Sequence, residues 1–565
     1  MIHQGTVSEI QPRRYTQLIL LLILLLAAFL RLVKLGQISP PGLNQDEAVN
    51  TWNAYCLLKT GKDQVGARWP IFYIHALGDN RSALYVYTMI PFLAAGGLSI
   101  WTARLVSAAA GILCIPLIYL VASRLFDRRV GLAAAALLAL NPWHLHISRW
   151  AVEAILCPLV SLLILAMMLW AKMPIKNGDT GHPRPLPAMA AGALAGIGCY
   201  GYPAIRLFIP IFLVLIVLVT FPAWRRSLKT RSGFLAIAAF IIAFASTFGP
   251  LAFKHLTDPE NISKRAGRIW IWEESDSTSQ KIQAVFARYL EHFGPDFLFI
   301  RGDHSNIQSP PNAGQYHWYE LPIMLAGLII LSKTLKTSYA ARILLVFLLV
   351  YPVGDCLSFH YGTDVKPSLH AFRSAPGLCG PTLLAAVGAV GSIAWLYKKR
   401  RKLAPLAIAV LVIAAIGING RYFYHFYGEY NRRPEIYYGF HTDLIEACQW
   451  LRPRFNDFDA VFCTTKGFNM PYVVTTVALG YDPRQWFAGG FDFTTQRYWD
   501  FYTRYGKMYF MYDKFFKPPV EKTYPPGRTL FIVRPGELNF ESIPSQLVHK
   551  IIGPDGGIAL LLYQV

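Results

Sequence analysis

Charged side chains are scarce in this chain of 565 residues, because Asp, Glu, Lys and Arg together make up only 15% of it. Soluble globular proteins carry roughly 25% charged residues. Hydrophobic residues account for 54% of the chain, and the mean hydropathy is +0.34. This composition excludes an ordinary soluble globular protein and predicts an integral, multi-pass membrane protein.

Clustered cysteines, internal repeats and low-complexity tracts are also missing. The eight cysteines lie far apart, without a C-x-x-C pair or the spacing of metal ligands. Cys114, Cys157 and Cys199 fall inside apolar segments, where a thiol acts as a small hydrophobic side chain. We therefore expect no disulfide framework and no zinc site.

The net charge of +21 does not indicate a nucleic-acid partner. Basic residues form short clusters between apolar runs instead of one continuous basic face. Such clusters report membrane topology, because Lys and Arg are retained on the cytoplasmic side during insertion.

About eleven apolar segments are predicted to cross the bilayer, several of them short of the roughly 20-residue standard. They are Leu18 to Val33, Thr102 to Val121, Val130 to Ile147, Ala154 to Trp170, Pro187 to Tyr202, Leu207 to Phe221, Phe234 to Phe253, Leu321 to Leu335, Ala341 to Cys356, Ala375 to Tyr397 and Leu403 to Ile418. The basic clusters fall on alternate connections, which predicts an N-terminus inside and a C-terminus outside. The clusters are Arg13 and Arg14; Arg124, Arg128 and Arg129; Lys172, Lys176 and Arg184; Arg225, Arg226, Lys229 and Arg231; Lys333, Lys336 and Arg342; and Lys398 to Lys402.

One further apolar run, Leu84 to Leu98, is left out of the spans. If it crossed, the later basic clusters would land outside. Its length and its glycines, Gly96 and Gly97, favour an interfacial or re-entrant helix.

Long connections lie on the predicted outer side, chiefly the first outer loop at 34–99 and a second at 254–320. From about residue 421 the composition becomes aromatic, charged and proline-rich. Ile445 to Leu451 is typical of a helix, and Ala460 to Thr465 of a short buried strand. We therefore expect a transmembrane module at 1–420 and a soluble extracytoplasmic α/β domain at 421–565.

Asp46 and Glu47 are adjacent carboxylates just past the first span. Removing a carboxylate from water costs several kcal/mol unless it is paired or functional, so acids at a membrane edge suggest chemistry. The alternative is that they cap a helix beginning near Ala48, because acids favour a helix N-terminus.

Topology brings further charged groups to the same outer boundary. They are His144, His146, Arg149 and Glu153 after the third span, Arg206, and His360, Lys366, His370 and Arg373 before the tenth. A carboxylate can take a proton from an incoming hydroxyl while guanidinium groups hold a phosphate leaving group. Each residue also has a structural alternative. Arg206 could snorkel, the histidines could be interfacial aromatics, Glu153 could pair with Arg149, and Arg373 could anchor a helix start.

A family resemblance rests on an ordered set of short motifs. These are Leu43-Asn44-Gln45-Asp46-Glu47, Asn80-Arg81-Ser82-Ala83-Leu84-Tyr85, Ala103-Arg104-Leu105-Val106-Ser107, Asn141-Pro142-Trp143, Ser148-Arg149-Trp150-Ala151-Val152-Glu153, Tyr200-Gly201-Tyr202-Pro203-Ala204-Ile205-Arg206 and His370-Ala371-Phe372-Arg373. In this order the chain from Leu18 to Ile418 resembles the GT-C superfamily of integral-membrane glycosyltransferases. The branch it resembles holds the protein O-mannosyltransferases and the bacterial aminoarabinose transferase, the family 39-like enzymes.

The resemblance implies the GT-C fold and transfer of a sugar from a polyprenyl-phosphate donor to a protein, lipid or glycan acceptor, with inversion. The expected place is the bacterial plasma membrane, with the active site facing outside or the periplasm. Asp46 becomes the general base, with Glu47 and Glu153 as supporting acids. Arg149, Arg206 and Arg373 become candidates for the lipid phosphate, and Arg81 and His360 further substrate-binding residues.

Adjacent first-loop acids differ from the separated Asp-x-Asp pair of the oligosaccharyltransferase branch, so no divalent cation or other cofactor is implied. Two other functions stay open: a polysaccharide polymerase or ligase using a lipid-linked glycan, and a lipid or solute transporter. Transporters place ionisable groups near the bilayer midplane and often contain inverted repeats, whereas the charges here lie at span ends.

Overall fold

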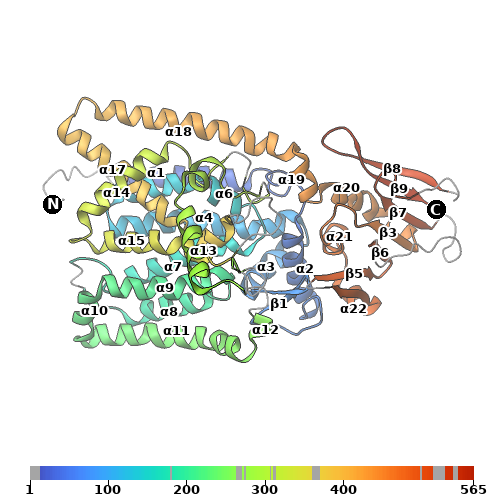
Figure 1. The fold of residues 1–565 in the computed structure, drawn as a ribbon, viewed down its shortest axis with the longest axis horizontal. Helices are drawn as coiled ribbons and strands as arrows, with labels where there is room; N and C mark the ends of the chain where they lie inside the picture. Colours follow the sequence, from blue (N-terminus) through green and yellow to red (C-terminus); the bar gives the residue numbers. More distant parts are fainter. Residues whose placement is uncertain are drawn as a thin grey trace.

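A computed structural model describes residues 13–178, 181–262, 270–272, 275–305, 307–309, 313–358, 369–496, 499–512, 528–538 and 545–565. Two residues of the predicted site region, His360 and Lys366, lie outside these ranges. The described chain forms a long helical bundle followed by a sheet domain, with the two chain ends at opposite ends of the molecule (Figure 1).

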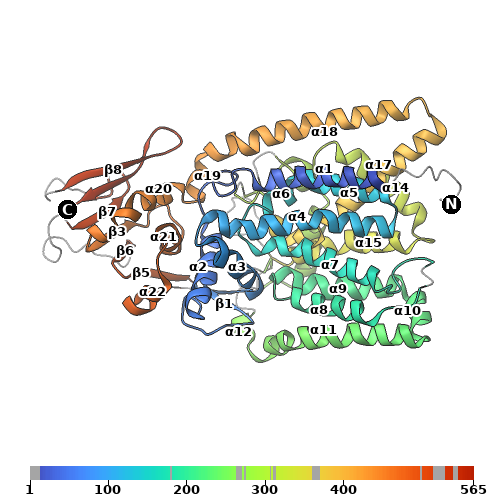
Figure 2. The same cartoon turned by 180° about the vertical axis from the view of Figure 1, so that it is seen from behind.

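Apolar helices aligned along the long axis build the bundle (Figures 1 and 2). They are α1 (Arg13–Leu32), α4 (Ile100–Leu125), α5 (Arg128–Leu140), α7 (Leu156–Trp170), α8 (Pro185–Gly198), α9 (Pro203–Val219), α11 (Arg231–Thr257), α14 (Glu320–Thr334), α15 (Tyr339–Val350), α17 (Cys379–Lys399) and α18 (Ala404–Tyr427). Each predicted span overlaps one of these helices, and the third also includes a second, short helix. The packing of α8 on α11 requires glycine, because a Cβ added at Gly192 would lie 2.1 Å from the Phe240 carbonyl oxygen.

Six helices in the described ranges are each long and apolar enough to cross a membrane. They are Arg14–Leu32, Ile100–Leu125, Glu153–Trp170, Arg231–Thr257, Cys379–Lys399 and Ala404–Arg432. A seventh span arises if α9 and α10 (Phe221–Leu228), bent by 81°, count as one. The remaining predicted spans correspond to shorter helices, so the count of about eleven stays a prediction.

The third predicted span is wrong as one continuous helix. α5 ends at Leu140, and a separate short helix, α6 (Pro142–Ile147), follows. Asn141 causes the break, because its side chain accepts a hydrogen bond from the His144 N–H and so caps α6. Pro142 has no N–H to continue α5.

One end of the bundle gathers the basic connections. Asn177 donates to the Thr337 carbonyl and accepts from the Tyr339 N–H, which ties two of these connections together. Arg342 donates to the Val219 carbonyl at 3.0 Å and brings in a third. This end carries the start of α1 and the elbow at α10, away from the sheet domain (Figures 1 and 2).

The opposite end carries α2 (Gln45–Thr60), the hairpin of β1 (Ile74–Ala76) and β2 (Asp79–Arg81), and α3 (Ala83–Gly96). These elements lie between the bundle and the sheet domain in both views (Figures 1 and 2). The predicted interfacial segment from Leu84 to Leu98 corresponds to α3, a helix of only 14 residues. The short elements α12 (Pro259–Ile262), α13 (Thr278–Glu291) and α16 (Ala371–Ser374) belong to other connections of the bundle.

The C-terminal domain is an α/β unit around a seven-stranded sheet of order β4-β5-β6-β3-β7-β9-β8. Its strands are β3 (Ala460–Thr464), β4 (Phe491–Gln496), β5 (Trp499–Tyr505), β6 (Met508–Met511), β7 (Thr529–Val533), β8 (Gln546–Ile552) and β9 (Ile558–Gln564); its helices include α19 (Pro434–Gly439), α20 (Thr442–Leu451), α21 (Pro471–Leu479) and α22 (Pro483–Gly489). The predicted strand is confirmed as β3, which is buried along its whole length and parallel to β6 and β7. The predicted helix is confirmed as part of α20.

Helix α2 shares its core with the C-terminal domain. Val49, Trp52 and Cys56 of α2 belong to the same buried cluster as residues of the sheet domain, including Trp486. The Trp52 and Trp486 ring centroids lie 5.5 Å apart, edge to face. The helix that begins with Asp46 and Glu47 is therefore held by the C-terminal domain.

Candidate active site

A capping box starts α2 and fixes the two acids of its first turn. The Asn44 side chain accepts from the Asp46 N–H at 3.0 Å, and the Glu47 carboxylate accepts from the Asn44 N–H at 3.1 Å. Successive helical residues point in different directions, so the adjacent acids face different surroundings. The capping alternative is thus part of the structure, because Glu47 accepts the hydrogen bond of the capping box.

Glu47 is buried in an ion pair with Arg104 of α4. Arg104 donates to both Glu47 oxygens at 2.7 Å, and neither side chain is exposed. The Ala151 N–H donates to the same carboxylate at 2.8 Å. Arg104 also donates to the carbonyls of Pro40 and Gly42. Glu47 therefore ties the start of α2 to α4 and to the chain at Ala151.

Asp46 lies on the open side of the same turn, with 38% of its side chain exposed. The Arg81 guanidinium donates to its carboxylate and approaches the buried Glu153 carboxylate at 3.8 Å. Burial alone lowers the pKa of Arg81, but the two carboxylates outweigh it and hold the pKa above its ordinary value. Three predicted site residues, Asp46, Arg81 and Glu153, thus form one cluster in which the arginine lies between the two acids.

Arg149 lies apart from this cluster. It is fully buried and donates to the carbonyl oxygens of Leu30, Arg31, Val33, Ile38 and Ser39 at 2.8–3.1 Å. Some of these carbonyls belong to the last turn of α1. The last carbonyls of a helix have no N–H partner within the helix, and Arg149 supplies donors to them. Arg149 therefore fixes α1, and it does not pair with Glu153.

Arg206, in the first turns of α9, lies beside the cluster. It donates to the Ser82 hydroxyl at 2.9 Å and to the Cys199 carbonyl at 3.1 Å. Ser82 directly follows Arg81 and precedes α3. Arg206 is partly exposed, so it has solvent access that Arg149 lacks.

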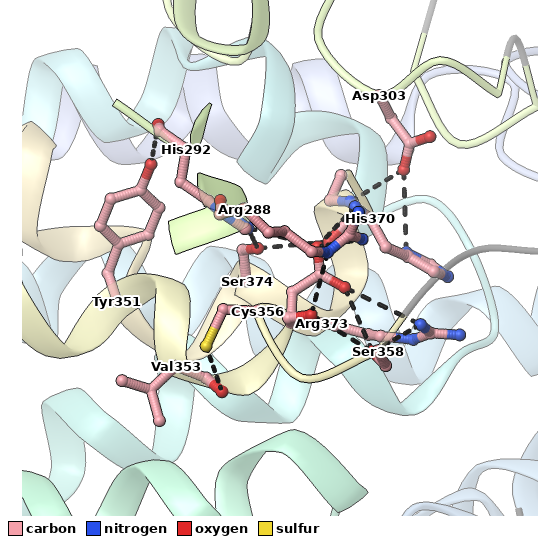
Figure 3. Close-up of polar contacts among 12 residues, drawn as sticks. Arg288, His292, Asp303, Tyr351, Val353, Cys356, Ser358, His370, Arg373 and Ser374 are labelled. Carbon is pink, nitrogen blue, oxygen red and sulfur yellow. Dashed lines mark hydrogen bonds and ion pairs between the residues drawn. The ribbon is translucent and has the colours of Figure 1, made fainter. Parts of the chain in front are cut away.

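Arg373 belongs to a second polar network, built around Asp355 (Figure 3). Arg373 donates to the Ser358 hydroxyl at 2.7 Å and lies 3.8 Å from an Asp355 oxygen. The other Asp355 oxygen accepts from Arg288 at 3.1 Å and lies 3.2 Å from His292. Asp355 is fully buried, and these cationic partners compensate the loss of water around its carboxylate.

Asp303 braces the same network from a different loop (Figure 3). It accepts from the Ala371 N–H at 2.8 Å and the Ser305 N–H at 2.9 Å, and lies 3.7 Å from the His370 ring. Burial raises the pKa of Asp303 to about 7 despite these donors. The residues that support Arg373 are therefore held in place by a carboxyl group that titrates near neutrality.

The two networks approach each other at the start of α9. A Cβ added at Gly354 would lie 2.3 Å from the Arg373 carbonyl oxygen and 2.8 Å from the Ala204 Cβ. Ala204 is two residues before Arg206. An apolar groove of about 590 Å³ runs along α13, and its lining includes Leu357, the residue before Ser358.

Sequence analysis assigned no role to Arg104, Arg288, His292, Asp303 or Asp355. Arg104 carried a usable signal, because a charged residue inside an apolar span needs a buried partner. Arg288 lies in the last turn of α13 and the other three lie in connections, so their proximity is a tertiary property. Within the described ranges, no three His, Cys, Asp or Glu side chains are grouped to hold a metal ion.

Comparison with known proteins gives a family-model match and several structural matches. The profile of the family described as dolichyl-phosphate-mannose-protein mannosyltransferase matches residues 82–249, which include Arg104, Glu153 and Arg206. The crystal structure of ArnT from Cupriavidus metallidurans bound to undecaprenyl phosphate has a TM-score of 0.51 at 12% identity, covering 96% of this chain and 97% of that one. Apo ArnT from the same organism gives 0.50 at 12% identity, covering 97% and 98%. No curated protein sequence matches the chain significantly.

The fold is that of a helical membrane protein of the GT-C class with a C-terminal sheet domain. The chain is therefore similar to the GT-C membrane glycosyltransferases in two respects: in sequence over residues 82–249 and in fold over nearly its whole length.

Proposed function

We propose that the protein transfers a sugar from a polyprenyl-phosphate donor to an acceptor hydroxyl on the extracytoplasmic side, with inversion at the anomeric carbon. The observation that carries the proposal is Asp46. It is an exposed carboxylate on a buried, arginine-braced cluster at the end of the bundle opposite the basic connections.

Asp46 acts as the general base. The acceptor hydroxyl gives its proton to the Asp46 carboxylate while its oxygen forms a bond to the anomeric carbon. The bond from that carbon to the phosphate oxygen breaks, and the lipid phosphate leaves with the electron pair. Arg81 orients Asp46, and Glu153 holds Arg81 from its buried side.

Charge develops on the departing phosphate, so guanidinium groups that face it stabilise the transition state. Arg206 and Arg373 suit this role better than Arg149, whose donors are taken by backbone carbonyls. Glu47 and Arg104 are positioning residues, because they fix the turn that presents Asp46.

Two observations support a polyprenyl donor. The ArnT structure that shares this fold is bound to undecaprenyl phosphate. The apolar groove along α13 has Leu357 in its lining, and the next residue in the chain, Ser358, accepts a hydrogen bond from Arg373, so we place the isoprenoid tail in this groove. We propose that the basic end of the bundle is cytoplasmic, and that residues 421–565 are the extracytoplasmic domain, although α18 continues to Tyr427.

The test is transfer of radiolabelled sugar from a panel of polyprenyl-phosphate donors in proteoliposomes. We expect the native chain to transfer label and Asp46→Asn to lose at least about 100-fold, in the range general-base catalysis contributes. Asp457→Asn, the same change at an exposed carboxylate of the C-terminal domain, is the control and retains activity. Transfer by Asp46→Asn at the native rate would remove its assignment as base. No transfer from any donor by a well-folded native chain would overturn the reaction class and favour transport.

A further inference from the structure

A cavity of about 430 Å³ lies between the C-terminal part of α18 and the connection that precedes α14. Its wall on α18 is one helical face, formed by Ile418, Arg421, Tyr422, His425 and Phe426, which follow the spacing of three and four residues. Trp318 is among the residues of the opposite wall. None of Asp46, Arg81, Glu153, Arg206 or Arg373 lines it. The cavity is therefore separate from the proposed active site.

The depth of the cavity in the bilayer follows from α18. This helix lies on the outside of the bundle in both views (Figures 1 and 2). It exposes an apolar surface up to Ile416, which is 68% exposed. The cavity begins at Ile418, and the first cation, Arg421, follows within one turn. Lipid phosphates lie at such a boundary, where apolar side chains give way to Arg and aromatic residues.

The cavity is positively charged and aromatic. Arg421 is exposed at its edge, and Arg433 lies on the far side of η6 (Glu429–Arg432) with 37% of its side chain exposed. The carboxylate in the lining, Glu429, is already paired with His425 at 2.6 Å. Arg433 lies 4.0 Å from the Glu435 carboxylate, which is outside the lining, and this exposed pair is weak enough for a ligand to compete with it. The two guanidinium groups of the lining favour an anion.

Two buried polar atoms in the wall indicate that the cavity is built for a ligand. His317 Nε2 and the Tyr422 hydroxyl have no hydrogen-bond partner among the described residues, although both side chains are more than nine-tenths buried. A buried polar group without a partner costs about 1–3 kcal/mol, so native structures usually satisfy it. A bound molecule with polar oxygens would supply these hydrogen bonds.

We propose that this cavity binds the phosphate-bearing headgroup of an anionic membrane lipid from the outer leaflet, independently of the donor lipid. Arg421 and Arg433 bind the phosphate, while His317 and Tyr422 hydrogen-bond to headgroup oxygens. The volume is large enough for a glycerophosphate-sized headgroup, and the acyl chains continue along the exposed apolar face of α18. The bound lipid joins α18 to the connection that also carries Asp303.

The experiment is native mass spectrometry of the full-length protein released from nanodiscs, with dioleoylphosphatidylglycerol and dioleoylphosphatidylcholine at equal amounts. We expect the native chain to retain the anionic lipid at least about tenfold over the zwitterionic one. Arg421→Ala combined with Arg433→Ala should remove most of that preference. Arg432→Ala, the same change at an exposed neighbour outside the lining, is the matched control and should keep it.

Tyr422→Phe separates loss of binding from loss of fold, because it removes only the unpartnered hydroxyl. It should weaken retention of the anionic lipid by about twofold to tenfold, the effect of one hydrogen bond, without lowering the melting temperature. Equal retention of both lipids by the native chain would overturn the proposal. So would full displacement by millimolar inorganic phosphate, since that result would identify a site for free phosphate. Retention by the double arginine variant at the native level would also overturn it.

Discussion

Arg104 grips both carboxylate oxygens of Glu47 at 2.7 Å, in a place where neither side chain has any exposed surface. The neighbouring Asp46 has 38% of its side chain exposed. The two adjacent acids therefore differ in role: Glu47 holds the site together, and Asp46 faces solvent.

Glu47→Gln should lower the free energy of unfolding by about 3–5 kcal/mol, because it leaves the Arg104 guanidinium buried without its counter-charge. Asp46→Asn should change it by less than about 1 kcal/mol, as expected for a partly exposed pair. Denaturant unfolding of both variants in the same detergent checks the difference. Equal losses would show that Asp46 is as structural as Glu47.

Arg149→Lys should destabilise the fold by about 2–4 kcal/mol, because a lysine cannot reproduce the contacts of Arg149 with five backbone carbonyls. Its KM for the lipid donor should stay within about twofold of native. Arg206→Lys tests the other assignment: its stability should be close to native, while transfer falls by about 10-fold or more. The two variants are compared by thermal unfolding and by initial rates over a range of donor concentrations. A donor-binding defect in Arg149→Lys at native stability would return that residue to the phosphate site.

Stability should depend on pH through Asp303. Its pKa is about 7 in the folded protein, against an ordinary value of 3.8, because it is buried. The folded state binds this proton more tightly than the unfolded chain. The contribution of Asp303 to stability is therefore complete below about pH 3.8, declines as the pH rises, and is lost above about pH 7.

Asp303→Asn replaces the titratable carboxyl group with an amide that does not titrate. Between about pH 5 and about pH 8 the melting temperature of the variant should therefore fall less than that of the native chain. The control is Asp457→Asn, which should follow the native curve. Parallel curves for Asp303→Asn and the native chain would show that Asp303 does not titrate in this range.

Trp486→Ala should cost about 3–5 kcal/mol, the usual effect of removing a buried tryptophan. Trp486 packs on Trp52 and donates to the Gln64 carbonyl at 3.0 Å, so its loss should also loosen α2. Hydrogen exchange should increase in α2, and sugar transfer should fall with it. Trp499→Ala, at a 45% exposed tryptophan of the same domain, should change neither. Unchanged exchange in α2 of Trp486→Ala would show that the C-terminal domain does not hold the helix.

Local sequence patterns predicted the positions of helices and strands correctly where those positions depend on neighbouring residues alone. Apolar length located every bundle helix, and the period of the C-terminal segment located β3 and α20. The sequence failed at Asn141, where a side-chain cap and a proline divide one apolar run into two helices. Whether the run forms one helix or two depends on the side-chain hydrogen bond of Asn141, and hydropathy does not measure hydrogen bonds.

The sequence by itself determined that the chain lies in a membrane and that its acids and arginines gather at the end opposite the basic clusters, because hydrophobicity and charge act on each segment separately. Only the tertiary structure decided which partner each charge has. Arg149 was predicted to hold phosphate, but its donors meet the carbonyls of α1, while Arg81 joins Asp46 to Glu153. Pairing between residues more than 30 positions apart follows from helix packing, because a guanidinium binds carbonyls and carboxylates alike and takes whichever group the fold brings within reach.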